Sequence, residues 1–359
     1  MAFEIKATGM AVPSRKITNE ELAEKIDTSD EWIRSHTGIG SRHIAADETA
    51  SSDLALEAAK NALSLAIGLK NHSAGNSGEV PGGFSTDLTE KIMADEALSL
   101  DIIVLATATP DFHGTPSTAC LVQEKLGAKN AGAMDITAGC TGFIYALETA
   151  AGLLSIGEHR KRALVIGTEI LSRFMDWNDR GSCVLFGDGA GAVILEKTEA
   201  PLKGKYRRGL IRTILGADGS GAEHLIIRRG GSRFPFKTGE ASQGVHIEMN
   251  GQAVYTFAVR AVTETIEEML TKEGLSADAL TFIIPHQANA RIVQAAANRL
   301  GIPEEKFFLN IDEYANTSAA SIPIALDELN RAGRISRGDL VLTVGFGGGL
   351  TWGANLIVW

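Results

Sequence analysis

An internal repeat is the feature of this sequence that most restricts its fold. The apolar run IIVLATATPD, which contains Thr107, resembles TFIIPHQAN, which contains His286. The turn that contains Cys140 resembles the turn that contains Ala319, and both pairs of residues lie 179 positions apart. Because these matches occur in the same order in both halves, the sequence predicts one structural unit that occurs twice.

A third match extends the repeat toward the end of each half. Residues 182–196 (SCVLFGDGAGAVILE) resemble residues 342–359 (LTVGFGGGLTWGANLIVW), with Phe186 opposite Phe346 at a separation of 160. The shorter separation predicts that the halves differ by loop insertions. Together the three matches place the boundary between the halves near residue 200.

The periodicity of the apolar residues predicts an α/β fold. Short β-branched runs alternate with longer runs of helical period, which is typical of layered α/β proteins. Residues 1–200 are expected to form the first unit and residues 201–359 the second, with an insertion at about 71–98 whose first part (71–87) is rich in Gly, Ser, Asn and Pro. The predicted strands lie within 101–111, 162–170 and 338–347, and the predicted helices within 53–67, 141–157 and 251–274.

Composition and charge argue against several classes of function. Acidic residues outnumber basic ones by 44 to 34, and the net charge of −10 disfavours binding to nucleic acid or to an anionic membrane. The sequence lacks both a run of about 18 apolar residues and a signal peptide, so we expect a cytoplasmic protein without a membrane span. The three cysteines, Cys120, Cys140 and Cys183, form no disulfide framework, and no metal site is expected.

Cys140 lies where a strand pattern turns into a helix pattern. Its thiol is thereby placed at a helix N-terminus, where free N–H groups and the helix dipole favour the thiolate. The pattern by itself fits a nucleophile and a small buried residue equally well. Cys120 and Cys183 lie in apolar runs without such a turn and are expected in the core.

His286 and Asn316 follow predicted strands, at the sheet edge where α/β folds place ligands. Each also has a structural interpretation, His286 as a hydrogen-bonded core residue and Asn316 as a cap or turn residue. The glycines after Phe346 either aim backbone N–H groups at an oxyanion or form a bulged turn. The glycine-rich run 186–191 lacks the remaining residues of a phosphate loop and is interpreted as a turn.

A cysteine, a histidine and an asparagine supply a thiol, an imidazole and an amide donor. Papain-like proteases use this set in the same order, but the residues around Cys140 lack their signature. The chain instead resembles the β-ketoacyl-[acyl-carrier-protein] synthase III family, the initiating condensing enzymes of type II fatty acid synthesis. The segments that carry the resemblance are TSDEWIRSHTGI (28–39), DITAGCTGFIYAL (135–147), NDRGSCVLFGDGAGAVIL (178–195), HQANARI (286–292), YANTSAASIPIAL (314–326) and GFGGGLTWG (345–353).

The resemblance implies the thiolase fold, a duplicated α-β-α-β-α sandwich that usually forms a homodimer. It implies that Cys140 attacks an acyl-CoA thioester and holds the acyl group. Malonyl-acyl carrier protein would then bind, and His286 and Asn316 would stabilise the enolate that develops as carbon dioxide leaves. The N–H groups of Cys140 and Gly348 would form a second oxyanion hole, and Phe346 would assist decarboxylation. Both acyl compounds are substrates, so no cofactor is implied.

The family motifs also predict residues that bind the substrate arms. Trp32 and Arg180 match the pair that sandwiches the adenine of CoA. Arg291 matches an arginine that docks the acidic acyl carrier protein, and Arg299 is expected on the same helical face two turns away. The positions that match the pantetheine tunnel are Thr28, Gly251, Ala288 and Asn289.

Two residues depart from the family pattern. His36 stands where many members have an arginine near the CoA phosphates. Thr115 stands where many members place an aromatic residue that closes the acyl pocket of the neighbouring subunit. The smaller side chain would leave a deeper pocket, so acyl primers longer than acetyl are predicted.

Two other functions stay open at this level. The nearer is a related acyltransferase or ketosynthase of specialised metabolism, and the more remote is a Cys-His-Asn hydrolase. Thiolases and hydroxymethylglutaryl-CoA synthases fit less well, because they use a second cysteine or a glutamate where this chain has other residues. The intact set of Cys140, His286 and Asn316 argues against an inactive binding scaffold.

Overall fold

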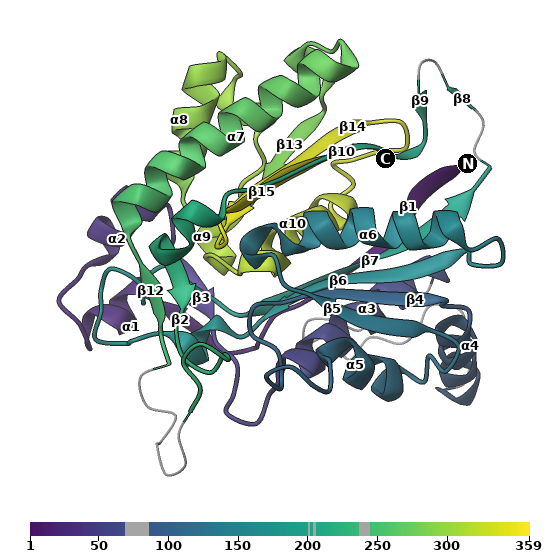
Figure 1. The fold of residues 1–359 in the computed structure, drawn as a ribbon, viewed down its shortest axis with the longest axis horizontal. Coiled ribbons are helices and arrows are strands. Elements are labelled where there is room, and N and C mark those ends of the chain that lie inside the picture. Colours follow the sequence, from purple (N-terminus) through teal and green to yellow (C-terminus); the bar gives the residue numbers. More distant parts are fainter. Residues whose placement is uncertain (69–85, 200–201, 204–205, 237–244) are drawn as a thin grey trace.

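Two β-sheets and three layers of helices alternate in the molecule, in the order α-β-α-β-α (Figure 1). The computed structural model describes residues 1–68, 86–199, 202–203, 206–236 and 245–359. The layered, duplicated architecture that the sequence predicts is therefore confirmed.

Five strands form the first sheet: β1 (Ala2–Ala11), β4 (Ile102–Ala106), β5 (Gly132–Ile136), β6 (Arg162–Glu169) and β7 (Gly189–Thr198). Their order is β1-β7-β6-β4-β5. β4 is parallel to β5 and β6, whereas β7 is antiparallel to both β6 and β1. Helices cover both faces of β4 and β6, which explains why these strands are apolar along nearly their whole length.

Four strands form the second sheet: β10 (Gly209–Ala217), β13 (Phe282–Pro285), β14 (Leu340–Gly347) and β15 (Thr351–Val358). Their order, β10-β15-β14-β13, and their directions repeat those of β1, β7, β6 and β4. A single bridge from Phe307 to Ile283 stands beside β13, where β5 stands in the first sheet. The two halves thus share one topology.

The helices are layered according to their apolar faces. α6 (Gly142–Ile156) and α10 (Ser321–Arg331) fill the space between the two sheets. The outer face of the first sheet is covered by α3 (Ser51–Ala66), α4 (Thr86–Leu98) and α5 (Thr118–Leu126). The outer face of the second sheet is covered by α7 (Gly251–Glu273) and α8 (Ala290–Leu300).

Smaller elements gather at the end of the sandwich where β4, β6 and β14 end (Figure 1). They are β2 (Lys16–Thr18), α1 (Asn19–Ala23), α2 (Asp30–Thr37), β3 (Ser41–His43), β11 (Leu225–Ile227), β12 (Ile247–Met249) and α9 (Ile311–Tyr314). β8 (Leu202–Lys203) and β9 (Tyr206–Arg207) pair with each other near the middle of the chain. Of the expected insertion at 71–98, residues 86–98 form α4, and the rest lies outside the described residues.

Two of the three repeat matches are confirmed, and the third is wrong. Thr107 and His286 each directly follow a matched strand, and Cys140 and Ala319 are the middle residues of matched 3₁₀ turns. Phe346, however, lies on β14, whereas its supposed match at position 186 precedes β7. A long segment joins β6 to β7, but only a tight turn joins β14 to β15, and this difference shifted the match.

The two cysteines expected in the core have different environments. Cys183 is fully buried, as predicted. Cys120 is exposed, so that prediction is wrong. α5 turns Ala119 and Val122 toward the sheet, and Cys120 lies on the helix face that these residues leave to solvent.

α6 packs in the central layer, between the two sheets. Phe143, Leu147 and Leu154 are fully buried and contact residues of both halves in one cluster. The run Gly139–Ile156 is long and apolar enough to cross a membrane by length and composition alone. A core helix has the same composition, and the packing of α6 between two sheets explains it here.

We expect Leu147→Ala to lower the free energy of unfolding by roughly 2–5 kcal/mol, because it opens a cavity between the two sheets. Urea denaturation followed by circular dichroism measures this change. Ile156→Ala at the end of the same helix is the matched control, since Ile156 is 81% exposed, and it should change stability by about 0.5 kcal/mol or less. Equal effects of the two changes would contradict the central position of α6.

Candidate active site

Cys140 lies in the turn that joins β5 to α6. The 3₁₀ turn Gly139–Thr141 runs directly into the helix, so the thiol lies at the helix N-terminus as predicted. Gly139 has a φ of +52°, and a Cβ atom there would lie 2.9 Å from the backbone nitrogen of Gly348. Glycine is required at this position, and its absence of a side chain lets the cysteine turn contact the second half of the chain.

His286 directly follows β13 and is buried. Its Nδ1 lies 2.8 Å from the hydroxyl of Ser321, the first residue of α10. That hydroxyl accepts a hydrogen bond from the N–H of Gln287, so its own proton is available for Nδ1. This arrangement favours the tautomer with the proton on Nε2. The ring of Phe346 meets the imidazole edge-on, with centroids 5.4 Å apart.

Asn316 lies in a loop that the first half of the chain holds in place. Its N–H donates to the carbonyl of Leu185, and its carbonyl accepts from the N–H of Gly187. The side-chain Oδ1 accepts from the N–H of Ser318 at 2.8 Å, which leaves the NH₂ end of the amide for a ligand. Ala315 and Ser318 have positive φ values of 57° and 46°, which are strained for residues with a side chain.

Two cavities meet at Cys140. One, of about 230 Å³, is lined by Cys140, His286 and Asn316. The other, of about 420 Å³, is lined by Cys140, by backbone-rich segments around Ala138 and Gly348, and by an apolar wall. The side chains of that wall are Leu171, Phe186, Ala222, Leu225, Ile226, Ile227 and Ile247. The structure therefore brings the three predicted residues together at one cavity, with the apolar cavity on the other side of Cys140.

Burial keeps both reactive groups neutral at rest. Desolvation is the main reason that the pKa of the Cys140 thiol rises to about 12; a hydrogen bond from Ser318 opposes the rise, and the nearby carboxyl of Glu169 adds to it by a smaller amount. Desolvation lowers the pKa of His286 to about 3. The expectation that the helix N-terminus favours a resting thiolate is therefore wrong, because burial outweighs the helix dipole.

Glu169 and Ser318 also belong to the site, although the sequence analysis missed both. Glu169 ends β6 and is fully buried. Its carboxylate accepts hydrogen bonds from the N–H of Ala108 and from the hydroxyls of Thr109 and Ser318. Burial raises the pKa of Glu169 to about 7. The signal in the sequence was a single carboxylate that ends an otherwise apolar strand.

Known proteins match the whole chain. Family models for 3-oxoacyl-[acyl-carrier-protein (ACP)] synthase III match residues 134–219 and, for its C-terminal part, residues 270–359. A β-ketoacyl-[acyl-carrier-protein] synthase III of Clostridium acetobutylicum is 43% identical over 358 residues, which cover 100% of this chain and 99% of that protein. The protein of the same name from Clostridium perfringens is 47% identical and covers 97% of each. This chain belongs to the β-ketoacyl-[acyl-carrier-protein] synthase III family.

Solved structures of the family have the same fold. The 3-oxoacyl-[acyl-carrier-protein] synthase III of Aquifex aeolicus is 42% identical, with a TM-score of 0.82 over 99% of this chain and 100% of that chain. The priming β-ketosynthase of the R1128 polyketide biosynthetic pathway is 31% identical, with a TM-score of 0.83 over 99% and 96%. The predicted thiolase fold is confirmed by these similarities.

The residues expected to bind adenine contact each other directly. Trp32 lines the smaller cavity, and the guanidinium carbon of Arg180 lies 5.2 Å from the centre of the indole ring. The ring of His36 stacks on Trp32 with centroids 4.5 Å apart. At this distance the guanidinium is in cation–π contact with the indole. It has to move before a flat base can enter between the two side chains.

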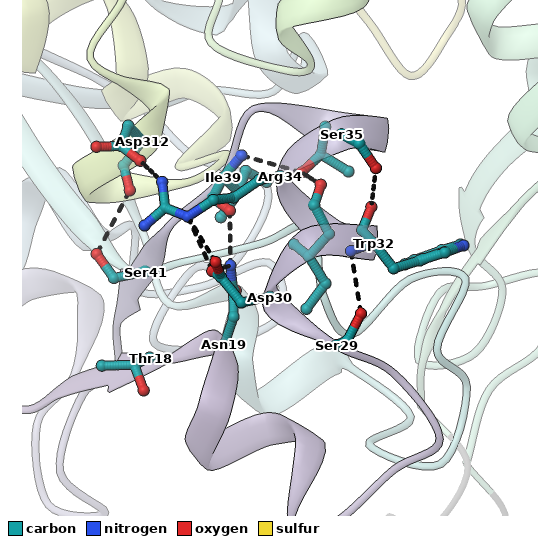
Figure 2. A network of polar contacts seen from close by, with 12 residues as sticks. Thr18, Asn19, Ser29, Asp30, Trp32, Arg34, Ser35, Ile39, Ser41 and Asp312 are labelled. Atoms are coloured by element: carbon teal, nitrogen blue, oxygen red, sulfur yellow. Dashed lines mark hydrogen bonds and ion pairs between the residues drawn. The ribbon is translucent and has the colours of Figure 1, made fainter.

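A polar network holds α2, the helix that carries Trp32, against α9 (Figure 2). Nε of Arg34 donates to both carboxylate oxygens of Asp30, and Nη1 donates to Asp312 at 2.5 Å. Figure 2 shows Trp32 on the opposite side of α2 from this network, so the network fixes the helix without contacting the indole. Because α9 leads directly to Asn316, the network also links α2 to the loop that carries Asn316.

Three of the four residues matched to the pantetheine tunnel line the smaller cavity, namely Gly251, Ala288 and Asn289. The amide nitrogen of Asn289 donates to the carbonyl of His36 at 3.0 Å, which ties the start of α8 to α2. Thr28 lies outside this lining. Within the part of the chain that the structure describes, its buried hydroxyl has no hydrogen-bond partner.

Three predicted residues lie at the surface, away from both cavities. Arg291 and Arg299 are exposed on α8, but eight positions place them about 80° apart around the helix axis, on adjoining faces and not on one. Thr115 is exposed in the segment between β4 and α5 and lines neither cavity of its own chain. Its predicted role concerns the pocket of a neighbouring subunit.

We expect alkylation of Cys140 by iodoacetamide to accelerate about tenfold per pH unit from pH 7 to pH 10, without a plateau. A thiol with a strongly raised pKa carries only a trace of thiolate in this range, and that trace grows with pH. Peptide mapping by mass spectrometry measures the rate at each cysteine, and Cys140→Ser identifies the relevant peptide. A plateau below pH 8 would contradict a neutral resting thiol.

Proposed function

We propose that this protein condenses an acyl-CoA primer with malonyl-acyl carrier protein, with loss of carbon dioxide, and thereby starts type II fatty acid synthesis. One observation carries the proposal. The Cys140 thiol lies where the cavity of His286 and Asn316 meets an apolar cavity. The first cavity suits a polar thioester arm and the second an acyl chain. The similarity to named synthases over the whole chain supports the same reaction.

The first step is transfer of the acyl group to Cys140. The thiol sulfur attacks the thioester carbonyl, the carbon–sulfur bond to coenzyme A breaks, and the thiol proton leaves with the coenzyme A thiolate. The backbone N–H groups of Cys140 and Gly348 would form the oxyanion hole for this step, since both residues line the same cavity. The acyl chain then occupies the apolar cavity.

The second step uses His286 and Asn316 as donors. Nε2–H of His286 and the NH₂ of Asn316 would hydrogen-bond the thioester oxygen of the malonyl group, which becomes an enolate oxygen as the carbon–carbon bond to carbon dioxide breaks. The carbanion carbon attacks the acyl carbonyl on Cys140 and expels the thiolate. The product is a β-ketoacyl-acyl carrier protein. These steps use no cofactor.

The proposal extends to partners and location. Arg291 and Arg299 on α8 give a net acidic chain a local positive surface for an acidic carrier protein. A homodimer would bring Thr115 of one subunit to the acyl cavity of the other, in agreement with its exposure in a single chain. The proposed location is the cytoplasm.

Intact-protein mass spectrometry separates the two steps. After incubation with acyl-CoA, we expect an acyl adduct on the wild type and none on Cys140→Ser. His286→Ala and Asn316→Ala should keep the adduct, but malonyl-acyl carrier protein should discharge it roughly 10²–10³-fold more slowly, because each variant lacks one donor to the enolate. The absence of an adduct with every acyl-CoA would contradict the proposed function.

The size of residue 115 is expected to set the primer length. The wild type should accept octanoyl-CoA as well as acetyl-CoA, whereas Thr115→Phe should retain acetyl-CoA and lose activity with octanoyl-CoA by about tenfold or more, because a phenyl ring fills space that several methylenes need. The rate of adduct formation by the wild type and by Thr115→Phe, over a series of acyl-CoA chain lengths, measures the primer preference. A strict acetyl preference of the wild type would rule out the predicted deep pocket.

A further inference from the structure

A buried carboxylate lies beneath the catalytic loop and touches no substrate cavity. Glu169 is fully buried and is absent from the lining of both cavities that meet at Cys140. Its oxygens accept from the N–H of Ala108 at 3.1 Å and from the hydroxyl of Thr109 at 2.6 Å. A buried carboxylate is costly unless its hydrogen-bonding capacity is met, and here several donors converge on it.

Ser318 connects this carboxylate to two catalytic groups. Its hydroxyl donates to Oε1 of Glu169 at 3.0 Å, and both Ser318 and Cys140 line the apolar cavity. Its N–H donates to Oδ1 of Asn316 at 2.8 Å. Ser318 therefore joins the buried carboxylate to the amide of Asn316 and stands beside the thiol of Cys140.

The backbone of this loop needs such an anchor. Ser318 has a φ of +46°, a conformation that costs free energy in a residue with a Cβ atom and persists only where surrounding contacts hold it. The hydroxyl of Ser318 supplies one such contact, because its bond to Glu169 joins β6 of the first half to the loop of the second half, across 149 residues of sequence.

The geometry points to Glu169 as a positioning residue of the condensing reaction, which holds Ser318 so that the amide of Asn316 and the thiol of Cys140 face the reacting thioesters. This inference rests on the proposed function, because the two oriented groups are those that act in its two steps. Glu169 itself contacts neither substrate cavity, so its loss should slow turnover and leave substrate binding unchanged.

The test is a kinetic comparison of Glu169→Gln with the wild type. Glutamine keeps the shape of the side chain, but an NH₂ group replaces one carboxylate oxygen. That NH₂ group would face the N–H and O–H donors that now bind the carboxylate. We expect kcat for condensation to fall roughly 10–100-fold, with KM for acyl-CoA and for malonyl-acyl carrier protein within about twofold of the wild type. Glu169→Asp, which restores an acceptor at shorter reach, should recover part of kcat and also serves if the glutamine variant fails to fold.

A double-variant cycle tests whether the effect passes through Ser318. Ser318→Ala should lower kcat to a similar extent, and the combination with Glu169→Gln should be little worse than either change alone. Asp327→Asn is the matched control, since Asp327 is a fully buried carboxylate of α10, away from the site, and accepts from the hydroxyl of Thr8 on β1 and from Arg331. It should lower the melting temperature and leave kcat unchanged.

Several outcomes would overturn the inference. They are a wild-type kcat in Glu169→Gln, a rise in KM that accounts for the whole loss, or additive effects in the double variant. If the wild type makes no β-ketoacyl product, the proposed function fails, and the rate of Cys140 alkylation then tests the coupling to Glu169 separately. A severalfold faster alkylation of Cys140 in Glu169→Gln, from loss of the neighbouring negative charge, would support the coupling, and an unchanged alkylation rate would refute it.

Discussion

The close contact between two glycine-containing turns is the constraint on which the site depends. A Cβ atom on Gly139 would lie 2.9 Å from the backbone of Gly348, and one on Gly347 would lie 2.5 Å from the nitrogen of Cys140. At this contact the backbone of the first half meets that of the second. Cys140 comes from one half and His286 and Asn316 from the other, so a side chain in the contact would separate them.

Burial determines the chemistry that this contact allows. The surroundings that exclude water leave a neutral thiol and a neutral imidazole, and they also strengthen every hydrogen bond made there. In the proposed reaction, a neutral His286 with its proton on Nε2 would be a donor to the developing enolate, a role that an imidazole acting as a resting base could not fill. The low polarity of the site therefore suits charge that exists only during the reaction.

The sequence predicts those parts of the fold and site that have a local pattern. Cys140 and His286 each stand at the end of an apolar strand, and the repeat brings both ends to one edge of the molecule. Cys120 was misplaced because an apolar run does not show which helix face a single residue occupies. Phe186 was misaligned because Phe-Gly pairs recur around different turns.

The carboxylate at the end of an apolar strand marks Glu169 as unusual, but its contact with Ser318 spans 149 residues and has no local signature. Each residue taken alone has an unfavourable feature, a buried carboxylate in one case and a left-handed backbone in the other. Together they compensate each other, since the loop supplies donors to the carboxylate and the carboxylate anchors the loop. Such a pair is hard to account for by stability alone, because apolar packing with an unstrained loop would serve the core better. The pair of Glu169 and Ser318 is explained if the strained loop has to hold Asn316 in one orientation.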